Sequence, residues 1–198
     1  AQEEVCISYV FDIGENDLTN GKVANWDTLK TIEVYVRDYD DTVEMYLHHL
    51  YYLDGTGSVN SVRKPRLEIQ AIGRKSDTTF LNSFFNERKG QVLETLTGVC
   101  DGRTITVDSG TYTLQNVTAK QDGTGTYVAL TGSSIDYKPP PGTRQVIYEL
   151  KFHAGWDKEG GTTFRHFHQK FMFNNTEVSA FNQTYESNLI RDGPCVMR

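Results

Sequence analysis

The sequence predicts a mainly β fold, an antiparallel β-sandwich of jelly-roll type with one helix and an N-terminal elaboration. From residue 91 onward, short runs of β-branched and aromatic residues are separated by Gly, Asp, Asn and Ser at the spacing typical of sandwiches and barrels. Three consecutive prolines at positions 139–141 are followed by a strand pattern at 146–152, where apolar and polar residues alternate. Only one segment has the capping residues and apolar spacing of a helix.

A chain of 198 residues is long enough to form one domain with a proper hydrophobic core. We expect residues 91–198 to form the jelly-roll-like sandwich and residues 1–90 to form an elaboration packed on it. One continuous domain over residues 1–198 is the alternative. The sequence contains no internal repeat and no low-complexity segment.

The N-terminal half opens with a strand pattern at residues 5–13. Apolar residues then alternate at 32–36 and again at 43–47, on either side of the polar stretch 37–41, which predicts a hairpin with an acidic turn. A helix that includes residues 43–50 is the alternative. Strands are favoured because β-branched and aromatic residues dominate this region.

The rest of the N-terminal half holds one more predicted strand, at residues 67–71, and the predicted helix at residues 76–90. Ser76 or Asp77 can cap the start of the helix, and Gly90 can close its end. The predicted elements that follow are short strands separated by turns. The strands are expected at 92–97, 104–107, 110–119, 125–130 and 164–173, and the turns at 100–102, 108–109 and 121–123.

The three prolines define a rigid segment of the chain. Each fixes φ and lacks a backbone N–H, so this segment cannot be a central strand. We expect residues 139–142 to form an exposed, ordered polyproline corner that positions the strand at 146–152. Ile147 interrupts the polar face of that strand, and its far side is therefore expected to be partly covered.

This region resembles a motif of structural and tail-fibre-like proteins from marine phages and large algal viruses. The pattern is Thr-Gly-Ser-Ser-Ile-x-Tyr-x-Pro-Pro-x-Gly-Thr, followed by a strand that begins Val-Ile-Tyr. Residues 109–121 and 174–187 also look like parts of that module, so the resemblance covers about the C-terminal half. The matching residues are Thr131, Gly132, Ser133, Ser134, Ile135, Tyr137, Pro139, Pro140, Gly142, Thr143, Val146, Ile147 and Tyr148.

Composition narrows the classes of function. Hydrophobic residues make up 37% of the chain and aromatic residues 12%, which describes a soluble globular protein, and no apolar run is long enough to span a bilayer. A net charge of −6 argues against a nucleic-acid-binding protein, because phosphate binding needs a basic surface. Asp38, Asp40 and Asp41 form the densest acidic cluster, which we interpret as a solvated turn rather than a calcium site.

Cys6, Cys100 and Cys195 are an odd number of widely separated cysteines, without the short spacings of zinc or redox sites. No secretory signal pattern is visible at residue 1. We therefore expect free thiols in a protein made in a host cytoplasm. Asn116, Asn174 and Asn182 are acceptor sequons, which would matter if the protein were secreted or made by a virus of a eukaryote.

Histidines give the only candidate for metal binding. His166 and His168 lie two apart on a predicted strand and so share a face, and His153 lies one strand earlier. A metal site would need further ligands, and these histidines fit ordinary sheet or interface positions better, so we expect no metal and no cofactor. No sequence motif of a nucleophile, phosphate loop or metalloprotease is present, and we expect no enzyme activity.

The strand at 164–173 has two partly apolar faces. An ordinary surface strand has one polar face, so the second face is expected to be covered by another layer or by a neighbouring subunit. Jelly-roll proteins of the virions that this chain resembles commonly act as trimers, so the resemblance implies a homotrimer, and the second apolar face places its contact on this sheet. One face carries Phe167, Phe171 and Phe173, and the predicted interface on the other carries Phe164, His166, His168 and Met172, with Lys170 among them.

The resemblance implies a non-enzymatic virion protein, a minor capsid, decoration (cement) or fibre component that contacts other virion proteins and, in one variant, a host-surface glycan. No nucleic acid or membrane partner is expected. The alternative is a secreted carbohydrate-binding module, in which Trp26 and Trp156 could stack on sugars. A third interpretation is a cupin-like metal enzyme that uses His153, His166 and His168.

Overall fold

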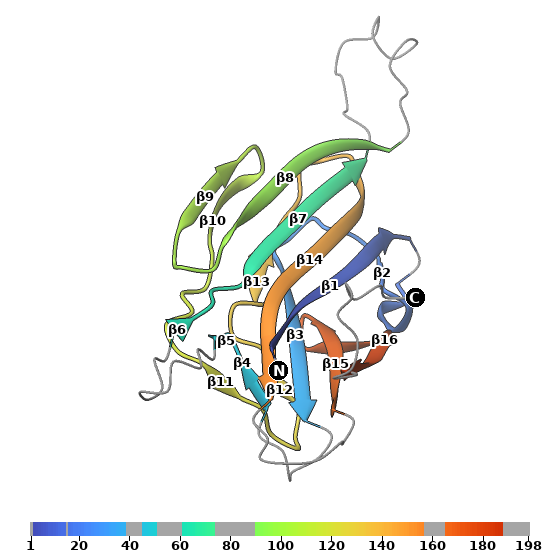
Figure 1. Cartoon of the computed structure of the whole chain (residues 1–198). Coiled ribbons are helices and arrows are strands. Elements are labelled where there is room, and N and C mark those ends of the chain that lie inside the picture. Colours follow the sequence, from blue (N-terminus) through green and yellow to red (C-terminus); the bar gives the residue numbers. More distant parts are fainter. Residues whose placement is uncertain are drawn as a thin grey trace, which may run out of the picture.

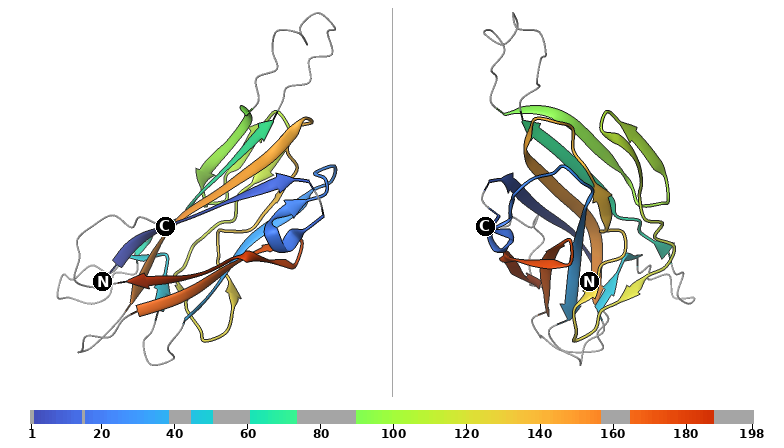
Figure 2. Two further views of the ribbon diagram at one scale, coloured as in Figure 1. Left: turned by 90° about the vertical axis from the view of Figure 1, so that its right-hand side faces the viewer. Right: turned by 180° about the vertical axis from the view of Figure 1, so that it is seen from behind.

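The computed structural model describes residues 2–14, 16–38, 45–50, 61–73, 90–156 and 165–187. Within them the chain forms two mainly antiparallel β-sheets that stack face to face, as the left view of Figure 2 shows. The predicted β-sandwich is confirmed, and its jelly-roll strand order stays a prediction. None of the described helices is long and apolar enough to cross a membrane.

The first sheet is built around β14 (Figure 1). β14 pairs with β1 along one side and with β7 and β4 along the other. All pairings in this sheet are antiparallel except the short parallel pairing of β1 with β2. Its strands are β1 (Gln2–Ile13), β2 (Lys22–Val23), β4 (Met45–Leu47), β7 (Arg66–Gly73), β8 (Gln91–Val99), β11 (Gln121–Asp122) and β14 (Thr143–Trp156).

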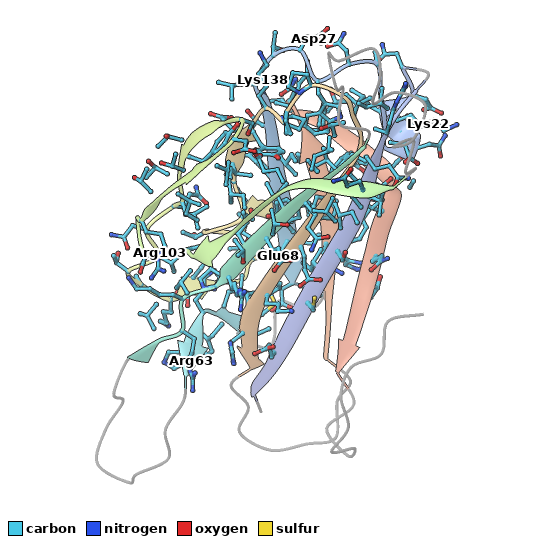
Figure 3. The ribbon with its side chains drawn as sticks, turned by 90° about the horizontal axis from the view of Figure 1, so that it is seen from above. Lys22, Asp27, Arg63, Glu68, Arg103 and Lys138 are labelled. Carbon is cyan, nitrogen blue, oxygen red and sulfur yellow. The ribbon has the colours of Figure 1, made fainter. Side chains whose placement is uncertain are left out.

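The second sheet is built around β3, which pairs with β15 on one side and with β12 and β13 on the other. Lys22 and Arg103, labelled in Figure 3, lie at opposite sides of the sandwich, Lys22 on β2 and Arg103 just before the hairpin of β9 and β10. The strands of the second sheet are β3 (Lys30–Asp38), β12 (Val128–Ala129), β13 (Ile135–Tyr137), β15 (Arg165–Phe173) and β16 (Thr176–Ser187). The remaining elements are the pair β5 (His49–Leu50) and β6 (Ser61–Val62), the hairpin β9 (Thr104–Val107) and β10 (Gly110–Thr113), and the 3-10 helix η1 (Leu18–Asn20).

Aromatic side chains fill the space between the two sheets. The Tyr148 ring of β14 lies 5.2 Å from the Phe171 ring of β15, and Phe152 lies 6.3 Å from Phe167. Such edge-to-face contacts stabilise a core beyond the area that they bury. The alternation of apolar residues in β3, β14 and β15 thus has a direct cause, since every second side chain points into this layer.

The proline corner is a turn that starts β14. The N–H of Thr143 donates to the Pro140 carbonyl at 3.3 Å, and Gly142 has a φ of 88°, as expected of a type II turn with proline in its second position. The corner is ordered as predicted, and Pro141 and Gly142 are exposed, but Pro139 is buried. A Cβ on Gly73 would collide with the Gly142 carbonyl, so the end of β7 packs directly against the turn.

The predicted hairpin over residues 32–47 is wrong. β3 lies in the second sheet and β4 in the first, so the two strands are not partners. Alternation shows that each strand buries one face, but it does not show which sheet supplies the neighbour. The expected turn at 121–123 is also wrong in part, because β11 pairs with β4.

Strands from both halves of the chain share each sheet. β1 and β7 flank β14 in the first sheet, and β3 pairs with β15 in the second. Neither sheet is therefore divided at residue 90, the predicted boundary between the N-terminal elaboration and the sandwich. The predicted helix at 76–90 lies outside the described residues apart from Gly90 itself, which has a positive φ.

Candidate functional site

The outer face of the five-stranded sheet, formed by the side chains of β3 and β15 that point away from the core, is the candidate site. On β15, Phe167 and Phe171 are buried in the core while His168, Lys170 and Met172 on the other face are half-buried. The predicted division of this strand into two faces is confirmed. The outer face is neither a solvated polar surface nor part of the core.

Two cations and two tyrosines form a cluster on this face, which we call the aromatic–cationic cluster: Tyr35, Arg37, Tyr127 and Lys170. The Tyr127 ring centre lies 4.8 Å from the Arg37 guanidinium and 4.5 Å from the Lys170 ammonium. Lys170 also lies 6.0 Å from the Tyr35 ring. Contacts of this kind stabilise a cation over the negative face of a ring.

An ion pair continues the cluster onto β16. Lys170 Nζ lies 2.8 Å from Glu177 Oε2, and only 17% of the Lys170 side chain is exposed. Hydrogen bonds from Lys170 and then from Asn182 lower the pKa of Glu177. The charge of Lys170 is thus held in place by an anion and two aromatic rings, so this side chain is preorganised.

The predicted interface residues fall partly on this face. Met172 lies opposite Glu33 on one side and Glu177 on the other. His168 Nδ1 lies 2.9 Å from Thr184 Oγ1. His166 is two residues earlier on β15, where the structure describes only the backbone, and Phe164 lies outside the described residues.

The proposed set of metal ligands does not converge. His153 lies on the outer face of the first sheet, because its neighbours Phe152 and Ala154 are buried in the core. His168 lies on the outer face of the second sheet, so the sandwich separates the two side chains. In the described segments, no group of three or more His, Cys, Asp or Glu residues could hold a metal ion.

A buried histidine, His48, lies between β4 and β5. Its backbone has a φ of 61°, unusual for a residue other than glycine, and its N–H donates to the His153 carbonyl at 2.8 Å. Its ring lies 6.1 Å from the Phe152 ring. Burial lowers the pKa of His48 to about 4, so this side chain is neutral near pH 7.

A buried carboxylate, Glu94, joins the hairpin of β9 and β10 to the sandwich. It accepts hydrogen bonds from the Ser109 N–H at 2.7 Å, the Ser109 hydroxyl at 2.6 Å and the Tyr137 hydroxyl at 2.7 Å. Tyr112 completes the network by donating to the Lys138 carbonyl at 2.8 Å. Burial and then Glu94 raise the pKa of Tyr137. Every member is engaged in holding the hairpin, so we interpret the network as structural.

An open groove of about 400 Å³ lies where β10 meets β13. Its polar groups are partly engaged within the protein, since Gln115 Oε1 accepts from the Gly132 N–H at 2.7 Å and from the Ser134 N–H at 3.1 Å. Tyr112 is the one aromatic residue among the described residues that line it, and it is 7% exposed. The lining residues are Leu29, Thr111, Tyr112, Thr113, Gln115, Ser134, Ile135 and Asp136.

The residues proposed for sugar binding have different environments. Trp26 is 5% exposed and packs against Phe173 with ring centres 5.2 Å apart, so it cannot be a sugar platform, which corrects that expectation. The side chain of Trp156 lies outside the described part of the chain. The three sequon residues Asn116, Asn174 and Asn182 are all exposed.

Two of the three cysteines lie in described segments. Cys6 is half-buried and Cys100 is buried, and both are free thiols, as predicted. Cys195 lies outside the described residues. Burial raises the pKa of Cys100 to about 11, and its Sγ lies 3.2 Å from the Gly132 carbonyl, so Cys100 is a packing residue.

Comparison with protein-family models, with curated proteins and with solved structures finds no match to this chain. The resemblance to virion proteins and the function that it implies therefore stay predictions.

Proposed function

We propose that this chain is a non-enzymatic structural protein of a virion that binds other proteins, including copies of itself, through the outer face of its five-stranded sheet. The aromatic–cationic cluster carries this proposal. Tyr, Arg and Met are enriched in protein interfaces, and energetically dominant interface residues are often Tyr and Arg. Here Arg37 and Lys170 are already held against tyrosine rings, so binding would order few side chains.

Sugar binding is the weaker candidate on this face. A sugar stacks on an open ring face, whereas the Tyr127 ring already contacts two cations. The observation that favours a carbohydrate-binding module is the groove between β10 and β13, which Thr, Gln, Ser and Asp side chains line. That groove lies away from the aromatic–cationic cluster, so variants can separate the two functions.

The test compares the wild-type protein with Tyr127→Ala and Met172→Lys variants. Light scattering measures association, and circular dichroism with thermal melting measures folding. Met172 lies beside Glu33 and Glu177, so a lysine is tolerated in the free subunit but would be desolvated in an interface. We expect the wild type to associate as a trimer through this face and both variants to associate less, Met172→Lys at an unchanged melting temperature and Tyr127→Ala at one lowered only by the loss of its two contacts with cations.

Thr106→Lys on the exposed strand β9 is the matched control, because it adds the same charge away from the cluster. It is expected to associate like the wild type. Two results together would contradict the proposal. The wild-type protein would stay monomeric at high concentration, and an antibody would detect it in culture medium but not in particles. Binding to a glycan array that Thr113→Lys in the groove abolishes would support the carbohydrate-binding alternative.

A further inference from the structure

Strand β1 has a long open edge. One side pairs with β14 from Gln2 to Asp12, whereas the other side pairs only with β2, at Asp12 and Ile13. The Asp12 N–H donates to the Gly21 carbonyl at 3.1 Å, so the backbone groups of Asp12 point away from β14. Peptide groups alternate along a strand, and those of Glu4, Cys6, Ser8 and Val10 therefore point to the same side. No strand of the described segments pairs with them.

The other two long edge strands, β16 and β8, are interrupted or covered. The pairing of β16 with β15 shifts register at Gln169, and η1 packs on β16. The pairing of β8 with β7 also shifts register, and the hairpin of β9 and β10 adjoins β8. Bulges and covering elements of this kind prevent edge-to-edge association. β1 pairs with β14 in unbroken register, and in the part of the chain that the structure describes no bulge interrupts it and no strand pairs with its open side between Gln2 and Phe11.

We propose that two copies of this chain associate by antiparallel pairing of β1 with β1, with Cys6 opposite the partner's Cys6. The contact joins two first sheets into one continuous sheet across a two-fold axis. It goes beyond the proposed function and uses a different surface from the outer face of the second sheet.

The structure selects this register over its neighbours. In any two-fold antiparallel alignment of β1 the outward-pointing residues meet outward-pointing residues, so the length of the pairing and the side chains that it opposes select the register. In an alignment centred on residue 7 or later, the partner strand would clash with β2, because β2 already pairs with β1 at Asp12. An alignment centred on Glu4 places two carboxylates opposite each other, which is destabilising. Centring on Cys6 gives the longest pairing and sets Glu4 opposite the partner's Ser8.

The side chains on the outer face of β1 fit such a contact. Val10 is 41% exposed, unusual for a large apolar residue in this protein, and the partner strand would cover it. Glu4 and Ser8 are exposed, and Cys6 is half-buried. The opposed Cα atoms of an antiparallel hydrogen-bonded pair lie about 5.5 Å apart, within the range that a disulfide can bridge.

Engineered cysteines test the register. In a Cys6→Ser, Cys195→Ser background, a Glu4→Cys copy and a Ser8→Cys copy are oxidised with copper phenanthroline and oxygen, separately and mixed. Each disulfide that forms releases two protons and two electrons to the oxidant. We expect most of the crosslinked dimer in the mixed sample and none above background in the separate samples. Equal crosslinking in all three samples, or none in any, would overturn the proposed register.

A proline variant tests the edge itself. Ser8→Pro removes an N–H that points to the open side, so the pairing with β14 keeps its hydrogen bonds. Ser8→Ala, the matched control, keeps the N–H. Both changes are made in the Met172→Lys variant, which weakens the contact proposed for the other sheet, so that sedimentation measures the β1 dimer alone. We expect Ser8→Pro in this background to be dimer-deficient with an unchanged circular dichroism spectrum, and Ser8→Ala to dimerise like Met172→Lys itself. Dimerisation of Ser8→Pro as strong as that of Ser8→Ala, or a wild type without any dimer and without a Cys6 crosslink, would overturn the proposal. Retention of this dimer in Met172→Lys distinguishes it from the contact proposed for the other sheet.

Discussion

Lowering the pH is expected to destabilise this protein through His48. Its pKa is about 4 in the folded protein, against an ordinary value of 6.5. The unfolded chain therefore takes up a proton first, and the stability that neutral His48 contributes is complete above pH 6.5 and is lost as the pH falls toward 4. With these two pKa values the loss is about 2 kcal/mol at pH 5 and about 3 kcal/mol at pH 4.

The assay is urea unfolding at pH 7.5, 6 and 5, for the wild type and for His48→Asn. Asn tolerates the positive φ at this position and does not titrate. Carboxylates and the other histidines titrate in both proteins, so the difference between the two pH dependences isolates His48. We expect the wild type to lose about 2 kcal/mol more than the variant between pH 7.5 and 5. Parallel pH dependences would refute a buried, neutral His48.

Three further outcomes are expected. Gly142→Ala is expected to lower the free energy of unfolding by about 1 kcal/mol, measured by urea denaturation, because Gly142 has a positive φ, and an unchanged value would contradict the type II turn. Tyr137→Phe removes a buried hydrogen bond to the Glu94 carboxylate and is expected to cost about 1.5–3 kcal/mol, which thermal melting can check against a Tyr35→Phe control. In the native protein Cys100 is expected to react with iodoacetamide more slowly than Cys6, and mass spectrometry of the digested protein would contradict this if the order were reversed.

Local patterns in the sequence were sufficient to predict most strands. The strands at 92–97 and 104–107 are confirmed as β8 and β9, and turn residues follow each of them in the sequence. The strands that pair with β3 and β4 could not be predicted, because these pairings depend on contacts between segments far apart in the sequence. The backbone N–H of Thr31, for example, donates to the Asn174 side chain 143 residues away.

The candidate site was predicted only as one face of β15. The aromatic–cationic cluster also draws Tyr127 from the segment before β12 and Arg37 from β3, and no local pattern links these segments. The burial of the Glu94 carboxylate could have been predicted, because Glu94 lies on the same face of its strand as the apolar residue Leu96, which is buried. His48 gave no such signal, since its burial follows from an irregular backbone between two short strands.

The central position of β14 sets the order in which this protein can fold. Asp12 of β1 meets Gln145 of β14 across 133 residues of chain, and β7, which pairs with β8 on one side, finds the partner for its other side only in β14. On the ribosome, the edges of β1 and β7 that pair with β14 thus have no permanent neighbour until the last third of the chain has emerged. Long loops must close before these contacts form, so folding is expected to be slow, on the order of milliseconds to seconds. Nascent chains that stop before Thr143 should therefore aggregate or engage chaperones rather than fold.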